Sequence, residues 1–462
     1  PIHTEVVANI KSIDEIYSLF FLLSSSLLLF SYVTEPKNNI PTYMLSVFLY
    51  FIALFSKENG ITFLVILPLM LYFFTDLSLK KIIILMIPFI VVFAGYFAIR
   101  LSVIGLNNYQ SNLLQNNPFL YATFDTRYGT VMVCLLKYLG LLFFPHPLSY
   151  DYTFNQIPLA GILSPWSILS ICIYSALLIY SIITIKSKNI VSFIVLFYLL
   201  SIFITSNILV DIGALLGERF LFQSSVAFSM FAGIVVYWLI NKLHAINVSK
   251  TLSFVLVVLP VVLLASGKTI ARNNAWKSEY NLYSTDVKSC PNSAVANNNA
   301  GVVLILYSDT VKDKARKSAI LSQAVSFCRK SRTILPSFYD AYVNAAIALI
   351  RDGKPDEALT DVFEIKKRNP EFYKLPNVIT YLVNEYNTRA RAAAEAKQLD
   401  KAVRDFGIAL RLDSTNISTY NNLGIALCLM DDFKKALTIF LNGLKRGPDD
   451  ESLLSYIAIT YL

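Results

Sequence analysis

The sequence predicts an all-α chain in two parts, a polytopic transmembrane helical domain followed by an α-solenoid of helical repeats. Long apolar runs follow one another up to about residue 267, and beyond it Asn, Asp, Lys, Arg and Ala dominate. The tail also repeats itself with a period of 34 residues. We therefore expect a membrane domain at 1–267, a linker at 268–290 and repeats at 291–462.

The composition supports a membrane protein and argues against a nucleic-acid-binding protein. Of the 462 residues, 15% are charged and 55% hydrophobic, whereas soluble domains carry about 25% charged residues. The net charge is +9, but the basic residues are scattered or lie at helix ends, so we expect no nucleic-acid partner. His3, His146 and His244 are too far apart for a ligand-spaced metal cluster. No cofactor is evident, and the sequence leaves a divalent metal ion open.

The cysteines are odd in number and form no CxxC pair. We expect core thiols, and a Cys290–Cys328 disulfide stays open as an alternative. The five are Cys134, Cys172, Cys290, Cys328 and Cys428.

Eight runs have roughly the apolar length that a membrane-spanning helix needs, about 20 residues. They are 14–33, 41–55, 61–75, 82–99, 162–184, 190–208, 222–241 and 251–267.

A ninth run at 129–145 contains Lys137 and ends in Pro145-His146-Pro147. Lys and Arg favour cytoplasmic loops, and the loop lysines can all be cytoplasmic only if 129–145 is interfacial or re-entrant. That topology places both the N-terminal polar cluster and the repeats outside, in the periplasm or the lumen of the endoplasmic reticulum. The alternative, in which 129–145 spans the membrane, moves Lys186 and Lys188 outward. The loop lysines are Lys37, Lys80, Lys81, Lys186, Lys188, Lys242 and Lys250.

The basic residues on the expected outer face lie in compact polar patches. Lys57, Arg100, Arg127 and Arg219 lie there, with the N-terminal HTE cluster and the SYDY segment at 149–152. Each alone is explained by snorkelling or by pairing with an acid. Together they favour a polar cavity at membrane depth, and Arg and Lys in such a cavity suit an anionic group such as a lipid phosphate.

The period of the tail is that of a tetratricopeptide repeat. Small residues recur where two helices cross closely, and aromatic residues recur between them. We expect about four repeats and one truncated further helix, with a concave surface for a peptide or protein. Tyr386, Ala402, Phe406 and Ala409 recur as Tyr420, Ala436, Phe440 and Gly443.

Motifs in both parts resemble those of the transmembrane and tetratricopeptide-repeat-containing O-mannosyltransferases and their bacterial relatives. That family belongs to the multispan, GT-C-like glycosyltransferases that use lipid phosphosugars. The absence of an initial Met and of a His before Pro1 indicates a fragment. The resemblance then places the main catalytic acid in an outer loop upstream of Pro1. The motifs are PIHTEVVANI (1–10), SKENGITF (56–63), PHPLSYDYTF (145–154), GERFLF (217–222) and ARNNAWKSE (271–279).

The resemblance also implies roles for particular residues. Arg219, with Lys57 and Arg127, holds the donor phosphate, whereas Glu5, Asp14 or Asp151 positions the substrates or takes a proton. The family usually has an Arg where this chain has Ile13, and Lys11 is the nearest basic residue. The further substrate-binding residues implied are His3, Glu58, Tyr150, Tyr152 and Glu218.

The sequence therefore predicts a membrane glycosyltransferase. It is expected to move a hexose, mannose above all, from a polyprenyl or dolichyl phosphate to a Ser or Thr hydroxyl of a protein that the repeats present. Two alternatives stay open: a ligase or polymerase of cell-surface glycans, and a non-enzymatic membrane-anchored scaffold. The sugar, the acceptor, the organism and the oligomeric state do not follow from the sequence.

Overall fold

The computed structural model describes residues 1–35, 39–105, 113–115, 117 and 119–461. The chain divides into two compact units, Pro1–Val295 and Ala296–Leu462. Lys37, which the topology argument used, lies outside the described residues.

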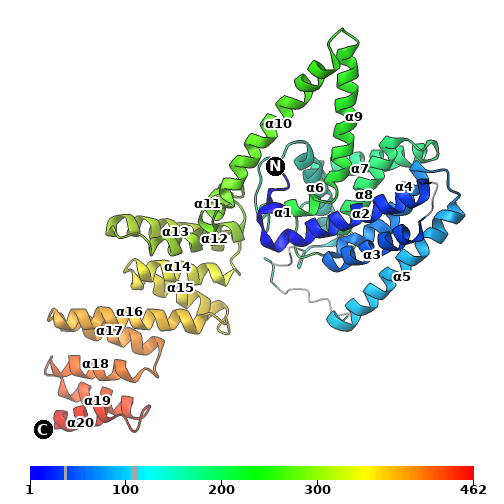
Figure 1. Cartoon of the computed structure of the whole chain (residues 1–462). Helices are drawn as coiled ribbons and strands as arrows, with labels where there is room; N and C mark the ends of the chain where they lie inside the picture. The colour runs from blue at the N-terminus through cyan, green and yellow to red at the C-terminus, as the bar shows by residue number, and fades with distance from the viewer. Residues whose placement is uncertain (36–38, 106–112, 116, 118, 462) are drawn as a thin grey trace. The chain divides into compact units, whose positions relative to one another are not determined.

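The first unit is built from helices and short 3-10 turns (Figure 1). They are α1 (Thr4–Ala8), η1 (Ile10–Ser12), α2 (Ile13–Thr34), α3 (Ile40–Ser56), η2 (Glu58–Thr62), α4 (Phe63–Phe74), α5 (Leu79–Ile104), α6 (Phe124–Phe143), α7 (Pro165–Thr184), η3 (Ile185–Ser187), α8 (Ile190–Phe203), η4 (Ile204–Ser206), η5 (Glu218–Leu221), α9 (Ser225–His244), α10 (Lys250–Ala275) and α11 (Glu279–Ser289).

Local sequence explains where several of these helices begin. Ser164 and Ser249 precede α7 and α10, and each side chain accepts a hydrogen bond from the backbone N–H three residues later. Asn189 does the same before α8 with the N–H of Val191. Such caps satisfy N–H groups that a helix leaves unpaired at its start.

Within the described part, five helical segments are long and apolar enough to cross a membrane. Shorter apolar helices cover 40–56, 58–74 and 190–206. Together they occupy the eight regions in which the sequence predicts spans. The five are Ile10–Thr34, Leu79–Ile104, Pro165–Ser187, Ser225–His244 and Lys250–Ala275. α6, in which we expect an interfacial segment, is not among them, and its position relative to a membrane stays a prediction.

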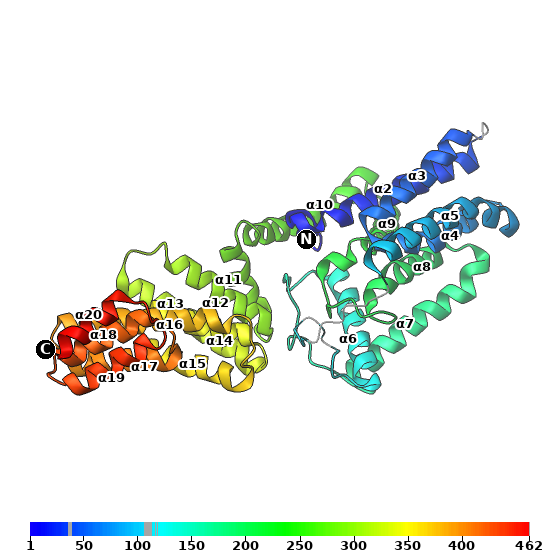
Figure 2. The same ribbon diagram turned by 90° about the horizontal axis from the view of Figure 1, so that it is seen from below.

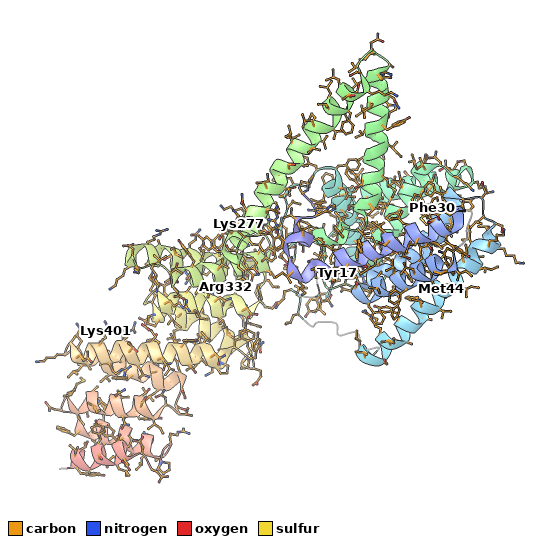
Figure 3. All side chains as sticks on the ribbon, viewed as in Figure 1. Tyr17, Phe30, Met44, Lys277, Arg332 and Lys401 are labelled. Carbon is orange, nitrogen blue, oxygen red and sulfur yellow. The ribbon has the colours of Figure 1, made fainter. Side chains whose placement is uncertain are left out.

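Helices α2 and α3 run side by side (Figures 1 and 2). Ser25 Oγ donates to the carbonyl of Ser46 at 2.8 Å, and Ser46 Oγ donates to the carbonyl of Ser25 at 2.7 Å. Small polar residues allow such close, reciprocal contacts between membrane helices. Tyr17 and Met44 lie on the outside of this pair (Figure 3), each about half exposed, as helices surrounded by lipid require.

The second unit is a stack of antiparallel helices (Figure 1). Its helices are α12 (Ala294–Ser308), α13 (Lys314–Ile334), α14 (Tyr339–Arg351), α15 (Pro355–Arg368), α16 (Leu375–Glu395), α17 (Leu399–Leu412), α18 (Ile417–Cys428), α19 (Phe433–Leu444) and α20 (Glu451–Tyr461).

The repeat residues are buried between these helices, as the sequence predicts. Tyr386, Ala402 and Phe406 are at most 1% exposed. A Cβ atom on Gly424 would lie 2.2 Å from the ring of Phe440, which explains why the position of closest approach requires glycine. The all-α prediction and the tetratricopeptide class are confirmed. The cysteines are free thiols, with Cys290 and Cys328 both buried.

Candidate functional site

The first unit contains a cavity of about 940 Å³. Its wall combines charged residues from α1, η1, α2, η2 and η5 with aromatic residues from η5, from the loop after α6, from the segment after α10 and from α11. Six residues that the sequence singles out line this cavity: Glu5, Asp14, Lys57, Glu58, Tyr150 and Arg219.

Glu5 and Arg219 form the first ion pair of the wall. The Glu5 carboxylate accepts from the Arg219 guanidinium at 2.7 Å and from the Arg219 backbone N–H at 3.0 Å. The Glu5 side chain is 2% exposed and that of Arg219 is 33% exposed. The acid is therefore more deeply buried than the cation, and both residues line the cavity.

Lys57 forms a second group with two acids of α2. Its ammonium donates to Asp14 at 2.6 Å and lies 3.4 Å from Glu15, which is buried. Burial alone would lower the pKa of Lys57, but the bonds and charges of Asp14 and Glu15 outweigh it, so the pKa is raised. Lys57 therefore carries a full positive charge at neutral pH.

Two further charged residues lie on the more open part of the wall. Glu58 is exposed and lies 3.6 Å from Arg100, whose guanidinium also donates to the Tyr96 hydroxyl. Lys11, considered above as a substitute for a missing Arg, lines the cavity and is exposed.

Glu218 and Tyr152 lie outside the cavity lining and bond to each other. One carboxylate oxygen of Glu218 accepts from the Tyr152 hydroxyl at 2.8 Å and from the Ser149 backbone N–H at 2.5 Å. Glu218 is 1% exposed, and burial raises the pKa of its carboxyl group to about 8. This pair ties the loop at 149–152 to the η5 turn.

Asp151 also holds the loop in place. Its carboxylate accepts from the hydroxyls of Ser293 at 2.6 Å and Thr153 at 2.7 Å. Burial raises its pKa against the opposing effect of these bonds. Asp151 is not part of the cavity lining, and its expected role in substrate positioning stays a prediction.

His3 and Arg127 also lie outside the lining. His3 Nε2 is 2.9 Å from Ser225 Oγ, and its ring meets Phe222 edge to face. The guanidinium of Arg127 lies over the ring of Phe119 at 5.5 Å. His3 therefore packs α1 against the start of α9, and Arg127 contacts an aromatic ring.

Sequence reasoning missed part of the wall. Trp276, Glu279 and Tyr283 line the cavity, and a buried ion pair joins Arg272 to Asp286 beside them. Trp276 and Glu279 belong to the motif at 271–279, and this motif is the sequence signal that could have predicted their place in the cavity wall. In the residues that the structure describes, no group of three or more His, Cys, Asp or Glu side chains could hold a metal ion.

Fold and cavity together define a membrane protein with many helices, a charged and aromatic cavity in its membrane unit, and a tetratricopeptide solenoid. Its curated homologues are protein O-mannosyl-transferases of the transmembrane and tetratricopeptide-repeat family, which confirms the resemblance. No protein-family model matches the chain.

The human protein O-mannosyl-transferase TMTC3 is 25% identical over an alignment that covers 100% of this chain and 52% of the human protein. The Caenorhabditis elegans protein O-mannosyl-transferase F38B6.6 is 28% identical over 310 residues, which cover 66% of this chain and 41% of that protein. The chain thus spans about half the length of these relatives.

Among solved structures, the chain is similar to YrrB, a tetratricopeptide protein with an unusual peptide-binding site. The two are 17% identical with a TM-score of 0.24, over 42% of this chain and 86% of YrrB. MamA from Desulfovibrio magneticus RS-1 is 16% identical with a TM-score of 0.24, over 42% of this chain and 96% of MamA.

Proposed function

We propose that this chain is the sugar-transferring part of a membrane glycosyltransferase. It moves a hexose, mannose in the first instance, from a polyprenyl or dolichyl phosphate to a Ser or Thr hydroxyl of a protein. The observation that supports this most is the cavity with two carboxylate-held cations, Arg219 and Lys57, which come from distant parts of the sequence.

The reaction exchanges one bond at the anomeric carbon for another. The acceptor oxygen attacks that carbon and the bond to the phosphate oxygen breaks. The phosphate leaves with the bonding electron pair, and a carboxylate takes the hydroxyl proton. Arg219 and Lys57 stabilise the charge that grows on the leaving phosphate, because fixed cations need no reorganisation at the moment of reaction.

Glu5 and Asp14 orient these cations in this proposal and do not take the proton. Each carboxylate is occupied by an ion pair, Glu5 with Arg219 and Asp14 with Lys57. The Arg219 side chain is one-third exposed and lines the cavity, and an arginine there suits bidentate contact with a phosphate.

The orientation and the acceptor are parts of the same proposal. The charged end of the membrane unit and the repeats face the periplasm or the lumen, so that donor and acceptor meet on the outer side. The repeats present the protein acceptor, since solenoids of this class offer extended concave surfaces.

The proposal is tested with the full-length protein in lipid nanodiscs and a labelled polyprenyl-phosphate mannose. Arg219→Ala is expected to lower transfer to a Ser/Thr peptide at least about 100-fold, the loss typical of removing a charge-stabilising donor. Arg351→Ala removes an arginine that pairs with Asp309 on the repeats and serves as the control. Undiminished transfer by Arg219→Ala would refute the role of Arg219.

A further inference from the structure

Three aromatic side chains from neighbouring segments line the cavity. Tyr150 comes from the loop after α6, Trp276 from the end of α10, and Tyr283 from α11. All three are half-buried, so each ring is partly accessible. The rings of Tyr150 and Tyr283 lie 4.8 Å apart between centroids, with 57° between their planes. We call these three residues the aromatic wall.

A buried ion pair fixes the aromatic wall from behind. Arg272 and Asp286 bond through both pairs of atoms, with 3.0 Å between Nη2 and Oδ2, and their side chains are 5% and 0% exposed. Asp286 also accepts from the Tyr150 backbone N–H at 2.7 Å. The guanidinium carbon of Arg272 lies 5.7 Å from the centroid of the Trp276 ring.

The pair thereby lies next to the Trp276 ring and holds the backbone of Tyr150. Tyr283 lies three positions before Asp286 in α11, which puts both residues on the same side of that helix. An isolated buried charge would be costly, so each partner depends strongly on the other. The buried pair therefore supports the backbone from which the wall residues project.

Another part of the cavity wall carries charged side chains in place of aromatic rings. Lys11, Lys57 and Arg219 line it beside the acids Glu5, Asp14, Glu58 and Glu279. The three basic side chains supply the hydrogen-bond donors that a phosphate would need. A pyranose ring has hydroxyl groups at its edge and C–H groups on its faces, and those faces pack on aromatic rings. A sugar joined to a lipid phosphate is one ligand that carries both kinds of group.

We infer that Tyr150, Trp276 and Tyr283 are the platform for the sugar ring of the lipid-phosphate-linked donor, and that Arg272 and Asp286 are the positioning residues that hold this platform. The inference rests on the proposed function and names the sugar subsite within the same cavity. The platform residues touch the substrate, whereas Arg272 and Asp286 act through them.

The test compares two lipids that differ only in the sugar. The full chain in nanodiscs is titrated with polyprenyl-phosphate mannose and with polyprenyl phosphate. Trp276→Ala and Tyr283→Ala are expected to weaken binding of the mannosylated lipid about tenfold, while binding of the bare lipid changes less than about twofold. Asp286→Asn is expected to show the same selectivity, which a general loss of stability would not produce.

The controls separate this effect from misfolding. Tyr280→Ala removes an exposed tyrosine of the same helix that does not line the cavity, and it is expected to leave both affinities unchanged. Trp276→Phe keeps an aromatic face and is expected to restore affinity for the mannosylated lipid to within about threefold of the original.

Several outcomes would overturn the inference. One is an equal loss of affinity for both lipids in Trp276→Ala and Tyr283→Ala, and another is no loss of affinity for either lipid. A third is a loss of affinity only for a Ser/Thr peptide, which would assign the aromatic wall to the acceptor. If the variants lose affinity only for the mannosylated lipid but the unmodified full-length protein transfers no hexose, the proposed function fails and the platform stands. If the unmodified chain transfers hexose while the variants bind and transfer normally, only the platform fails. An unmodified chain that does not bind the mannosylated lipid refutes both.

Discussion

Glu5 and Arg219 lie 214 positions apart in the sequence and meet through two hydrogen bonds to one carboxylate. One bond fixes the backbone of the η5 turn and the other fixes the direction of the guanidinium. The nearly buried acid thus sets both the place and the orientation of a cation on the cavity wall.

Removing the Glu5 carboxylate should therefore loosen the η5 turn. Glu5→Ala is expected to lower the free energy of unfolding by about 1–2 kcal/mol, because a charged hydrogen bond is lost while Arg219 regains part of its hydration. Glu5→Gln keeps the acceptor shape and should cost less. Thermal denaturation measures both changes, with Glu395→Ala on the exposed end of α16 as control. Equal melting temperatures for all three would contradict the account.

Glu218 gives stability a dependence on pH. Burial raises the pKa of its carboxyl group from 4.5 to about 8, so between these values the folded chain binds a proton that the unfolded chain releases. Its contribution to stability is present at low pH and is lost as pH rises through about 8. The melting temperature of Glu218→Gln, which is neutral at every pH, should depend less on pH from 5 to 8. An unchanged slope in this variant would show that Glu218 is ionised in the fold.

In the second unit, Arg389 of α16 connects two successive tetratricopeptide repeats. Its guanidinium donates to Asp405, which is fully buried, and to Asp356 of α15. Arg389→Ala leaves Asp405 without its main partner and is expected to cost about 2–4 kcal/mol. Hydrogen exchange should then become faster across α16 and α17. Lys435→Ala, which removes an exposed pair on α19, should leave exchange there unchanged. Equal rates in the two variants would argue against this inter-repeat connection.

Gly129 allows α6 to approach the chain at 160–162. A Cβ atom there would lie 2.2 Å from the carbonyl oxygen of Ala160 and 2.3 Å from the carbonyl carbon of Gly161. Backbone cannot move aside as a side chain can, so Gly129→Ala is expected to cost about 1–3 kcal/mol. Gly140 lies in the same helix with open space around its Cα, and Gly140→Ala should be neutral or stabilising. A melting temperature that falls for both variants alike would contradict this packing.

The architecture could be predicted because its signals are local and repeated. Apolar runs mark the helices of the membrane unit. Tyr386 and Phe406 recur at fixed spacing because each repeat fills the same gap between two helices. Lys57 and Arg219 could also be singled out, since a charge beside an apolar run requires a partner or a cavity.

The remaining site residues depend on long-range contacts that one sequence does not reveal. Glu15 resembles a surface residue at the start of α2, and only tertiary packing buries it beside Lys57. Asp151 has the residue type of a catalytic acid, but Ser293, 142 positions away, holds its carboxylate. Trp276 follows the last predicted span, and its place on the cavity wall depends on the path of α10 and α11.

The central claim is that the carboxylate-held cations of the cavity bind the phosphate of a lipid-linked sugar. The most direct measurement is the affinity of the full chain in nanodiscs for polyprenyl-phosphate mannose, compared with Lys57→Ala, Arg219→Ala and the double variant. The account predicts that each single variant weakens binding about tenfold or more and that the double variant weakens it further. Unchanged affinity in the double variant would contradict the account.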